Sequence, residues 1–294
     1  MKNYIKLLFI FLIIPIIGIA QEDDTKKKKV IDKPERPAFE SATLIDNPTN
    51  VLFKKNTLEI MMQHRFDLIE SNNTLLGIYG AANIRIAASY AIIDRLTVGF
   101  GTTKDRRLQD FNLKGAILQQ TRSGKIPLSI SYYGNFTIDA RPMSPTDSEL
   151  AYRQDRYSFF NQIIIARRFN RKFSAFVSPS ISHINRVKNG MKNDMFGLAI
   201  GGRYKITDGT SIVVDYSQPL TKNDQNNPNP GFSIGFEFGT SAHTFSIFAT
   251  NNKAIVPQYN YMYNQNDFFG TGANTNDGRA NILVGFNITR NYNF

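Results

Sequence analysis

Few side chains in this 294-residue chain have the type and spacing that chemistry needs. It contains no cysteine, which excludes disulfides, thiolate metal sites and thiol nucleophiles. Its three histidines, His64, His183 and His243, lie in separate segments without HxH or HExxH spacing, so we expect no metal site and no cofactor. Gly99 and Gly101 in VGFGTT are followed by no helical pattern, and they therefore do not predict a phosphate-binding loop.

Ser182 and His183 form the one pair that suggests nucleophilic catalysis, and they resemble the Ser/His pair on the wall of outer-membrane phospholipases. Adjacent residues of an extended strand point to opposite faces, however. Ser182 therefore cannot be the nucleophile that His183 activates, and Ser180 or a neighbouring strand would have to supply it. We expect no catalytic residue and no enzyme, with a membrane-embedded lipid hydrolase as a minor alternative.

A set of charged residues is the stronger candidate for a functional site, because all its members occupy polar positions of alternating apolar and polar segments. If those segments form a barrel, these side chains line its lumen. One interpretation is that they form cross-strand ion pairs that brace the wall. The other is that the arginines and lysine form a constriction that selects anionic or polar solutes. The candidate lumen-lining charges are Glu59, Arg65, Arg85, Lys114, Arg203, Asp215 and Glu237.

The elements that must position these charges are β-strands. NTLEIMMQHRF places Leu58, Ile60 and Met62 on one face and Glu59 and Gln63 on the other, which is the period of a strand. The same alternation recurs to the end of the chain and predicts about twelve strands, an even number that single-chain membrane barrels share. FFNQIII is apolar on both faces, so the facing of the sixth and seventh strands stays open.

The connections between these strands alternate in length. Short turns are predicted around Asp94, Gly124, Asn170, Gly209 and Ser241, and most of the links between them are longer. This pattern is typical of an up-and-down barrel with short turns in the periplasm and long loops outside, and it places both termini on the periplasmic side. A soluble lipocalin-like barrel or a β-sandwich shows the same alternation with its apolar face turned inward. The composition of the polar face suits a water-filled lumen, and the number of strands is high for a small soluble barrel. Both features favour an all-β transmembrane antiparallel barrel.

The chain divides into three parts. Residues 1–20 carry two lysines, an apolar run and small residues before Gln21, as a cleaved signal peptide does. Residues 21–55 are charged and proline-bearing, and they predict a flexible periplasmic lead in which the less polar stretch Phe39–Asp46 could dock under or inside the next domain. Residues 56–294 form the barrel. Its last strand ends on Tyr292 and Phe294, which resemble the signal that the outer-membrane assembly machinery recognises.

Several stretches resemble an uncharacterised Bacteroidota outer-membrane β-barrel family, domain of unknown function 5777. They are LEIMMQHRF, IRIAASYAIIDRLTVGFGTTK, IIIARRF, GGRYKIT and VGFNITRNYNF. The resemblance covers most of Leu58 to Phe294 and implies a barrel in the bacterial outer membrane. It brings no known activity, cofactor or catalytic residue with it.

Function follows only in outline from the sequence. Export and the mixture of basic with acidic residues disfavour nucleic acid, and the expected partners are outer-membrane lipid, the assembly machinery and small polar solutes. The chain is expected to be a passive channel or a binder of small polar solutes. The alternative is a non-conducting structural or interaction barrel that binds through its extracellular loops, such as 251–278, or through its lead. A continuous channel would favour transport, and a filled lumen would favour the alternative.

Overall fold

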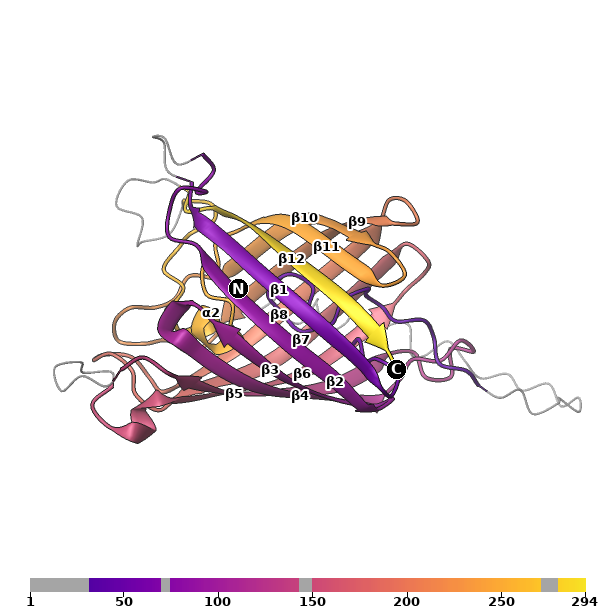
Figure 1. Ribbon diagram of the computed structural model, residues 1–294, viewed down its shortest axis with the longest axis horizontal. Helices are drawn as coiled ribbons and strands as arrows, with labels where there is room; N and C mark the ends of the chain where they lie inside the picture. The colour runs from indigo at the N-terminus through magenta and orange to yellow at the C-terminus, as the bar shows by residue number, and fades with distance from the viewer. Residues whose placement is uncertain (1–31, 70–74, 143–149, 271–279) are drawn as a thin grey trace, which may run out of the picture.

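The computed structural model describes residues 32–69, 75–142, 150–270 and 280–294, so the predicted signal peptide and the lysine run at 26–29 lie outside the described residues. Twelve antiparallel strands form a closed barrel in which each strand pairs with its neighbours in the sequence and the last pairs with the first (Figure 1). The prediction of an up-and-down barrel with an even strand number is confirmed. The strands are β1 (Thr57–Leu68), β2 (Asn83–Ile93), β3 (Leu96–Thr103), β4 (Leu108–Leu118), β5 (Ser129–Asp139), β6 (Tyr157–Arg168), β7 (Phe173–Ile184), β8 (Asp194–Lys205), β9 (Thr210–Pro219), β10 (Gly231–Gly239), β11 (His243–Thr250) and β12 (Leu283–Asn293).

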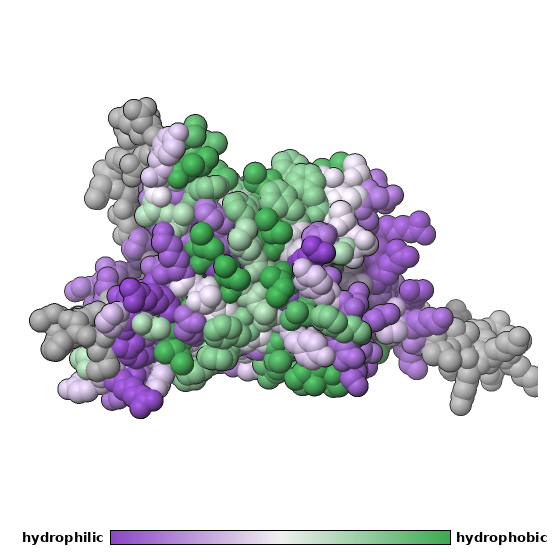
Figure 2. Space-filling view, in the orientation of Figure 1, coloured by the Kyte–Doolittle hydropathy of each residue, from purple (hydrophilic) through white to green (hydrophobic). Residues whose placement is uncertain are grey.

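The outer surface of the barrel is a belt of apolar side chains. Exposed and buried residues alternate along the strands, and the exposed positions carry large groups such as Ile86, Phe111, Phe236 and Ile247. Figure 2 shows the hydrophobic residues gathered over the strands, with hydrophilic residues at both ends. In water such a continuous belt would be strongly unfavourable, whereas lipid stabilises it. The large apolar side chains therefore face outward, as the sequence predicted.

The two ends of the barrel differ in their connections. Short links join β2 to β3, β6 to β7, β8 to β9 and β10 to β11 at one end, where the chain also enters β1 and leaves β12 (Figure 1). We call this the turn end and the opposite one the loop end. The turn predicted around Gly124 is longer than expected: residues 119–128 join β4 to β5, and Thr121 pairs there with Pro34.

The lumen is filled by two segments of the chain itself. Residues 38–53, which we call the N-terminal plug, enter from the turn end and return to it. Residues 251–267, the α2 loop, enter from the loop end and carry the short helix α2 (Pro257–Tyr263), whose residues from Pro257 to Met262 are all buried. Phe39, Leu44 and Ile45 are buried inside the barrel, so the less polar stretch Phe39–Asp46 docks there as the sequence allowed. The flexible lead predicted over 21–55 therefore does not extend to residues 38–53.

The N-terminal plug and the α2 loop explain why β6 and β7 have apolar residues on both faces. Phe160, Ile164 and Phe176 point into the lumen and are fully or almost fully buried. Phe176 meets Phe39 of the N-terminal plug edge to face, with ring centroids 5.6 Å apart. Phe160 stacks on Tyr261 of α2 at 5.7 Å. This side of the lumen is thus a hydrophobic core, and alternation of polarity fails where a strand packs against lipid outside and a core inside.

Two glycines of β8 make room for the N-terminal plug and the α2 loop. A Cβ on Gly197 would lie 2.4 Å from the ring of Tyr261. A Cβ on Gly201 would lie 2.3 Å from Phe176 and 2.8 Å from the side chain of Leu44. All three distances are shorter than van der Waals contact, so these two positions require glycine for the lumen to be packed as it is.

The outward orientation of the apolar belt gives a stability prediction. Ile247 lies in the middle of β11, opposite Phe236 and Phe286 on the outer face. Ile247→Arg places a charge in lipid and should lower the free energy of unfolding in lipid vesicles by roughly 2–4 kcal/mol, as measured by urea titration. Tyr79→Arg, at an exposed apolar residue in the β1–β2 connection, is the matched control and should change it little. An equal effect of the two substitutions would contradict the orientation.

Candidate functional site: a lumen closed from both ends

The N-terminal plug is a compact hairpin stabilised by its own backbone. The amide of Leu44 donates to the carbonyl of Asn47 at 2.9 Å, and the amide of Thr49 donates to the carbonyl of Ala42 at 2.9 Å. The hydroxyl of Thr49 donates to the carbonyl of Ser41 at 2.6 Å. These bonds leave the amides at the tip of the hairpin without a partner inside the plug, so the barrel wall must supply one.

Asp215 of β9 supplies that partner. Its Oδ2 accepts the backbone amides of Asp46 and Asn47, each at 2.9 Å, and its Oδ1 accepts the side-chain amide of Asn47 at 2.7 Å. Asp215 is 2% exposed, so its charge is stabilised by these donors and not by bulk water. The carboxylate therefore acts as an anchor for the tip of the plug.

Asp46, at the tip of the plug, meets three parts of the molecule. Its Oδ1 pairs with the guanidinium of Arg65 of β1 at 3.1 Å, and both side chains are almost completely buried. Its Oδ2 accepts the hydroxyl of Ser233 of β10 at 2.6 Å and the side-chain amide of Asn252 of the α2 loop at 3.1 Å. Arg65 also lies over the ring of Phe248, 4.5 Å from its centroid. Asp46 thus joins the wall, the N-terminal plug and the α2 loop.

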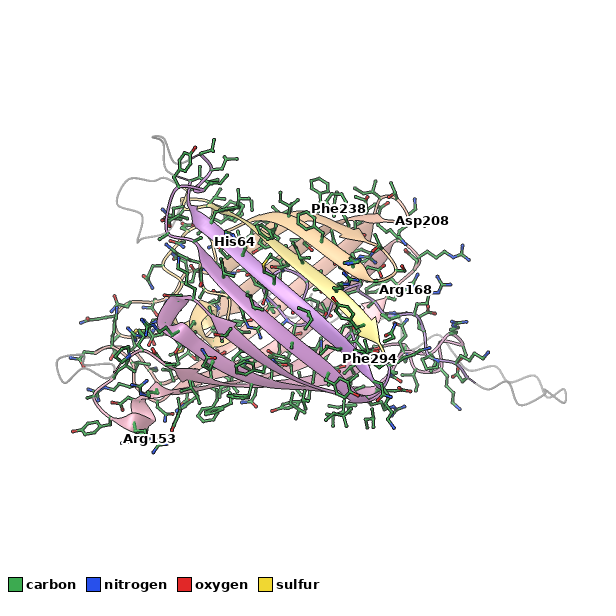
Figure 3. All side chains as sticks on the ribbon, viewed as in Figure 1. His64, Arg153, Arg168, Asp208, Phe238 and Phe294 are labelled. Carbon is green, nitrogen blue, oxygen red and sulfur yellow. The ribbon has the colours of Figure 1, made fainter. Side chains whose placement is uncertain are left out.

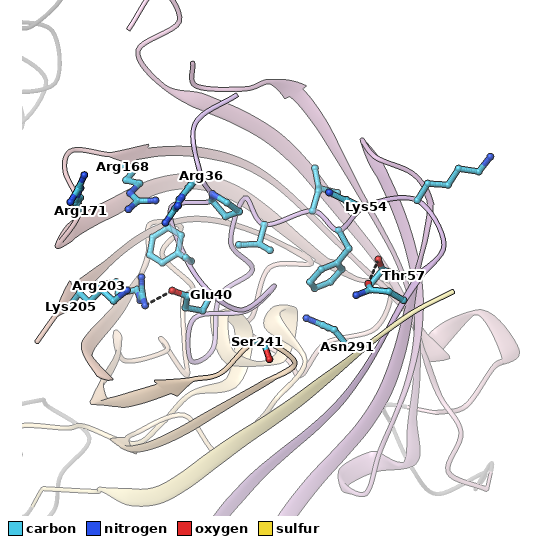
Figure 4. Close-up of a pocket in the computed structure, with 17 residues that line it drawn as sticks. Arg36, Glu40, Lys54, Thr57, Arg168, Arg171, Arg203, Lys205, Ser241 and Asn291 are labelled. Atoms are coloured by element: carbon cyan, nitrogen blue, oxygen red, sulfur yellow. Dashed lines mark hydrogen bonds and ion pairs between the residues drawn. The ribbon is translucent and has the colours of Figure 1, made fainter. Parts of the chain in front are cut away.

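Two further lumen cations hold the plug. The ammonium of Lys114 of β4 donates to the carbonyl oxygens of Ala42 and Thr49 at 3.0 and 3.2 Å. Arg203 of β8 pairs through Nε with Glu237 of β10 at 2.8 Å. Through a terminal nitrogen it pairs with Glu40 of the plug, also at 2.8 Å (Figure 4). Each cation therefore finds its partner in the lead and leaves no charge directed at an open channel.

Arg85 has a different role, because it braces the wall. It pairs with Asp110 of β4 through two bonds, at 2.8 and 2.7 Å, and it also donates to Gln63 of β1 at 2.8 Å. Arg85 and Asp110 belong to β2 and β4, and the pair passes over Gly101 of the strand between them. A Cβ on Gly101 would lie 2.5 Å from atoms of both side chains, so glycine is required for this brace.

All seven charged residues predicted to line the lumen are buried in it. Arg65, Lys114, Arg203 and Asp215 contact the N-terminal plug, and Arg85 braces the wall. Glu237 is the buried partner of Arg203, and Glu59 lines a small internal cavity together with Lys114. Sequence reasoning missed their partners Glu40, Asp46 and Asn47. The less polar stretch Phe39–Asp46 indicated that this part of the lead could dock under or inside the barrel, but no individual contact could be predicted from it.

The α2 loop is held in the lumen by polar contacts of its own. The side-chain amide nitrogen of Gln258 donates to Asn135, Thr137 and Ser158 of the wall at 3.0, 2.9 and 3.2 Å. Burial raises the pKa of the Tyr261 hydroxyl above its usual range, so this group stays neutral. Polar side chains of the wall and of the α2 loop together hold the loop in the lumen.

The residues considered for catalysis face different environments. Ser182 is buried on the lumen side, whereas His183 lies on the outer side with its ring nitrogens 2.8 Å from Asp194 and 3.1 Å from Asn185. His64 lies on the outer face of β1, stacked on Phe286 (Figure 3). Among the described residues no group of three or more potential ligands could hold a metal ion.

The C-terminal residues lie at the turn end. Phe294 is exposed, and Tyr292 is exposed beside Arg290, whose guanidinium lies 4.8 Å from the centroid of its ring (Figure 3). None of the helices among the described residues is long and apolar enough to cross a membrane.

Comparison with known proteins places the chain in a family. Residues 39–292 match the family described as membrane bound beta barrel domain (DUF5777), and the chain belongs to it. The match begins at Phe39, so the family includes the N-terminal plug as well as the strands. No curated protein matches the sequence.

Solved porin structures show a distant likeness. A NanC porin is 8% identical, with 81% of this chain and 98% of that chain covered and a TM-score of 0.46. A KdgM porin is 6% identical, with 81% and 99% covered and a TM-score of 0.45. Outer membrane phospholipase A from Escherichia coli is 9% identical, with 82% and 91% covered and a TM-score of 0.42. Values this low indicate nothing about a solute or an activity of this chain.

The grip of the wall on the plug can be measured by hydrogen exchange. Asp215→Asn removes the charge that accepts the amides of Asp46 and Asn47, and hydrogen bonds to charged groups contribute about 1.5–3 kcal/mol. We expect these two amides to exchange roughly ten to a hundred times faster. Asp110→Asn is the matched control, because it also neutralises a buried lumen carboxylate but one that pairs with the wall. Unchanged exchange in Asp215→Asn would contradict the anchoring role.

Proposed function

We propose that the protein is an outer-membrane barrel whose lumen is closed at rest and which acts by binding at its ends, not by conducting solutes freely. The observation that carries the proposal is the filling of the lumen from both ends by residues 38–53 and 251–267. Cavities of about 520 and 270 Å³ lie beside the N-terminal plug at the turn end and beside the α2 loop. Three further cavities along the two segments have volumes of only about 40, 60 and 20 Å³. Each of these three holds at most a few water molecules.

The proposed location follows from the family and from the sequence. A membrane-bound barrel that begins with an export signal is inserted in the bacterial outer membrane after cleavage before Gln21. The turn end then faces the periplasm and the loop end faces outward. Tyr292 and Phe294, at the exposed end of β12, are available to the assembly machinery before the barrel closes.

A gated passage is the second candidate, and the path of the N-terminal plug favours it. Both ends of the plug are at the turn end, so the segment can leave the lumen without unthreading any strand. Its withdrawal would free Arg65, Lys114 and Arg203 from their partners in the lead. The lumen would then present cations to a solute, which favours small anionic or polar molecules.

The geometry gives no support to a lipid hydrolase. Both ring nitrogens of His183 already bond to oxygen atoms of Asp194 and Asn185, and Ser182 lies on the other side of the strand. We therefore assign no catalytic role to either residue.

Planar-bilayer recordings test the closed lumen. The mature chain should show no conductance above the lipid baseline, because residues 38–53 and 251–267 fill the lumen. Steady conductance of the unmodified chain would contradict the proposal. Heat-modifiable migration on a gel serves as the control that the inserted protein is folded.

The gated passage has its own test, in a chain whose lack of cysteine makes disulfide trapping clean. Asp46→Ala with Asp215→Asn loosens the plug and should produce openings. Adding Asn47→Cys and Ser217→Cys allows a crosslink between the tip of the plug and β9, because the side-chain amide of Asn47 donates to the hydroxyl of Ser217 at 2.7 Å. Oxidation should abolish the openings and reduction should restore them. If the loosened variant shows no openings in its reduced form, gating by the plug is contradicted.

A further inference from the structure

A cavity opens at the turn end, between the N-terminal plug and the wall (Figure 4). Its volume of about 520 Å³ is within the range of small-molecule sites. We call it the vestibule. Phe39, Val51 and Phe53 of the plug line it as an apolar floor, so a molecule that enters from the turn end meets a closed base.

The vestibule has an unbalanced charge. Seven basic side chains line it and only one acidic side chain, Glu40, does so. Among the described residues, the side chains of Arg36, Lys54, Lys55 and Arg171 make no ion pair or hydrogen bond. Cations gathered in a concave site with low-dielectric walls produce a stronger field than the same charges on an open surface, and this field attracts anions.

Glu40 marks the place where an anion would bind. Its carboxylate is 44% exposed, yet it pairs at 2.8 Å with Arg203, whose side chain is only 10% exposed. Arg203 is held from behind by the buried Glu237, so its position does not depend on Glu40. A guanidinium has five donor hydrogens and binds carboxylate or phosphate oxygens equally well. Glu40 is therefore an internal substitute that a free anion can displace.

From these observations we propose that the vestibule is a binding site for a small oxyanion with two or more carboxylate or phosphate groups. One anionic group replaces Glu40 on Arg203, and the others are held by the unpaired cations of the rim, Arg171 and Lys54 among them. The proposal rests on one part of the proposed function, the N-terminal plug, which forms the floor that retains the ligand.

Isothermal titration calorimetry of the mature chain in detergent tests the site, with citrate as the carboxylate probe and inorganic pyrophosphate as the phosphate probe. We expect saturable binding of at least one probe that weakens as ionic strength rises. The probe that binds more tightly shows whether the site prefers carboxylate or phosphate groups. The absence of saturable binding of both at low ionic strength, or binding that is independent of salt, would overturn the proposal.

Charge variants locate the binding. Arg171→Gln and Lys54→Gln should each weaken the affinity by about two- to fivefold, as expected for partly exposed charge pairs. Glu40→Gln should tighten it by a similar factor, because it removes the competing carboxylate. Arg122→Gln is the matched control, since Arg122 is exposed in the β4–β5 connection at the same end but outside the vestibule. The assignment would be overturned if Arg122→Gln lowered the affinity as much as Arg171→Gln does, or if Glu40→Gln weakened the binding.

The calorimetric test of anion binding can be separated from the conductance test of the closed lumen. Calorimetry in detergent reports binding whether or not the barrel conducts. Anion binding in a conducting barrel would refute the closed lumen and support the site, whereas a silent barrel without anion binding would refute the site alone.

Discussion

A barrel of twelve strands encloses more space than its own inward side chains can fill, and the remaining architecture follows from this constraint. About eight strands give an interior that side chains just fill, and wider barrels either hold water or admit another segment of chain. Here residues 38–53 and 251–267 occupy the space from opposite ends. The filled lumen in turn decides which residues of β6 and β7 are apolar on the inner face and where β8 requires glycine.

Charge in this interior has to be matched group by group. A buried ion without a partner destabilises a protein strongly, so the wall and the plug must provide opposite charges or backbone dipoles at fixed positions. Asp215 binds amides, Lys114 binds carbonyl oxygens, and Arg65 binds Asp46. None of these contacts is directed at a free solute. The same set of residues that would line a constriction in an open barrel serves here to position a segment of the chain.

The sequence predicted the barrel well because the governing signal is local. Alternation of apolar and polar residues along each strand depends only on neighbours two positions apart, so the strands, the outward face and the inward charges of β1, β2 and β9 could all be predicted. The partners of those charges could not, since Asp46 and Asp215 are separated by most of the chain. The lower polarity of Phe39–Asp46 indicated that this stretch could dock, but it did not predict which wall residues the stretch contacts or that burial continues to Val51.

The ambiguous strands carried more information than the regular ones. A strand between lipid and water alternates in polarity, whereas a strand between lipid and a packed segment has apolar residues on both faces. Phe160 and Ile164 break the alternation of β6, and they do so where Tyr261 and the plug pack. Loss of alternation in the middle of an otherwise regular barrel sequence is therefore evidence of an occupied lumen. Asp46 contacts both Arg65 of the wall and Asn252 of the α2 loop, so the N-terminal plug and the α2 loop meet at one polar centre. A movement of either segment therefore changes the environment of the other.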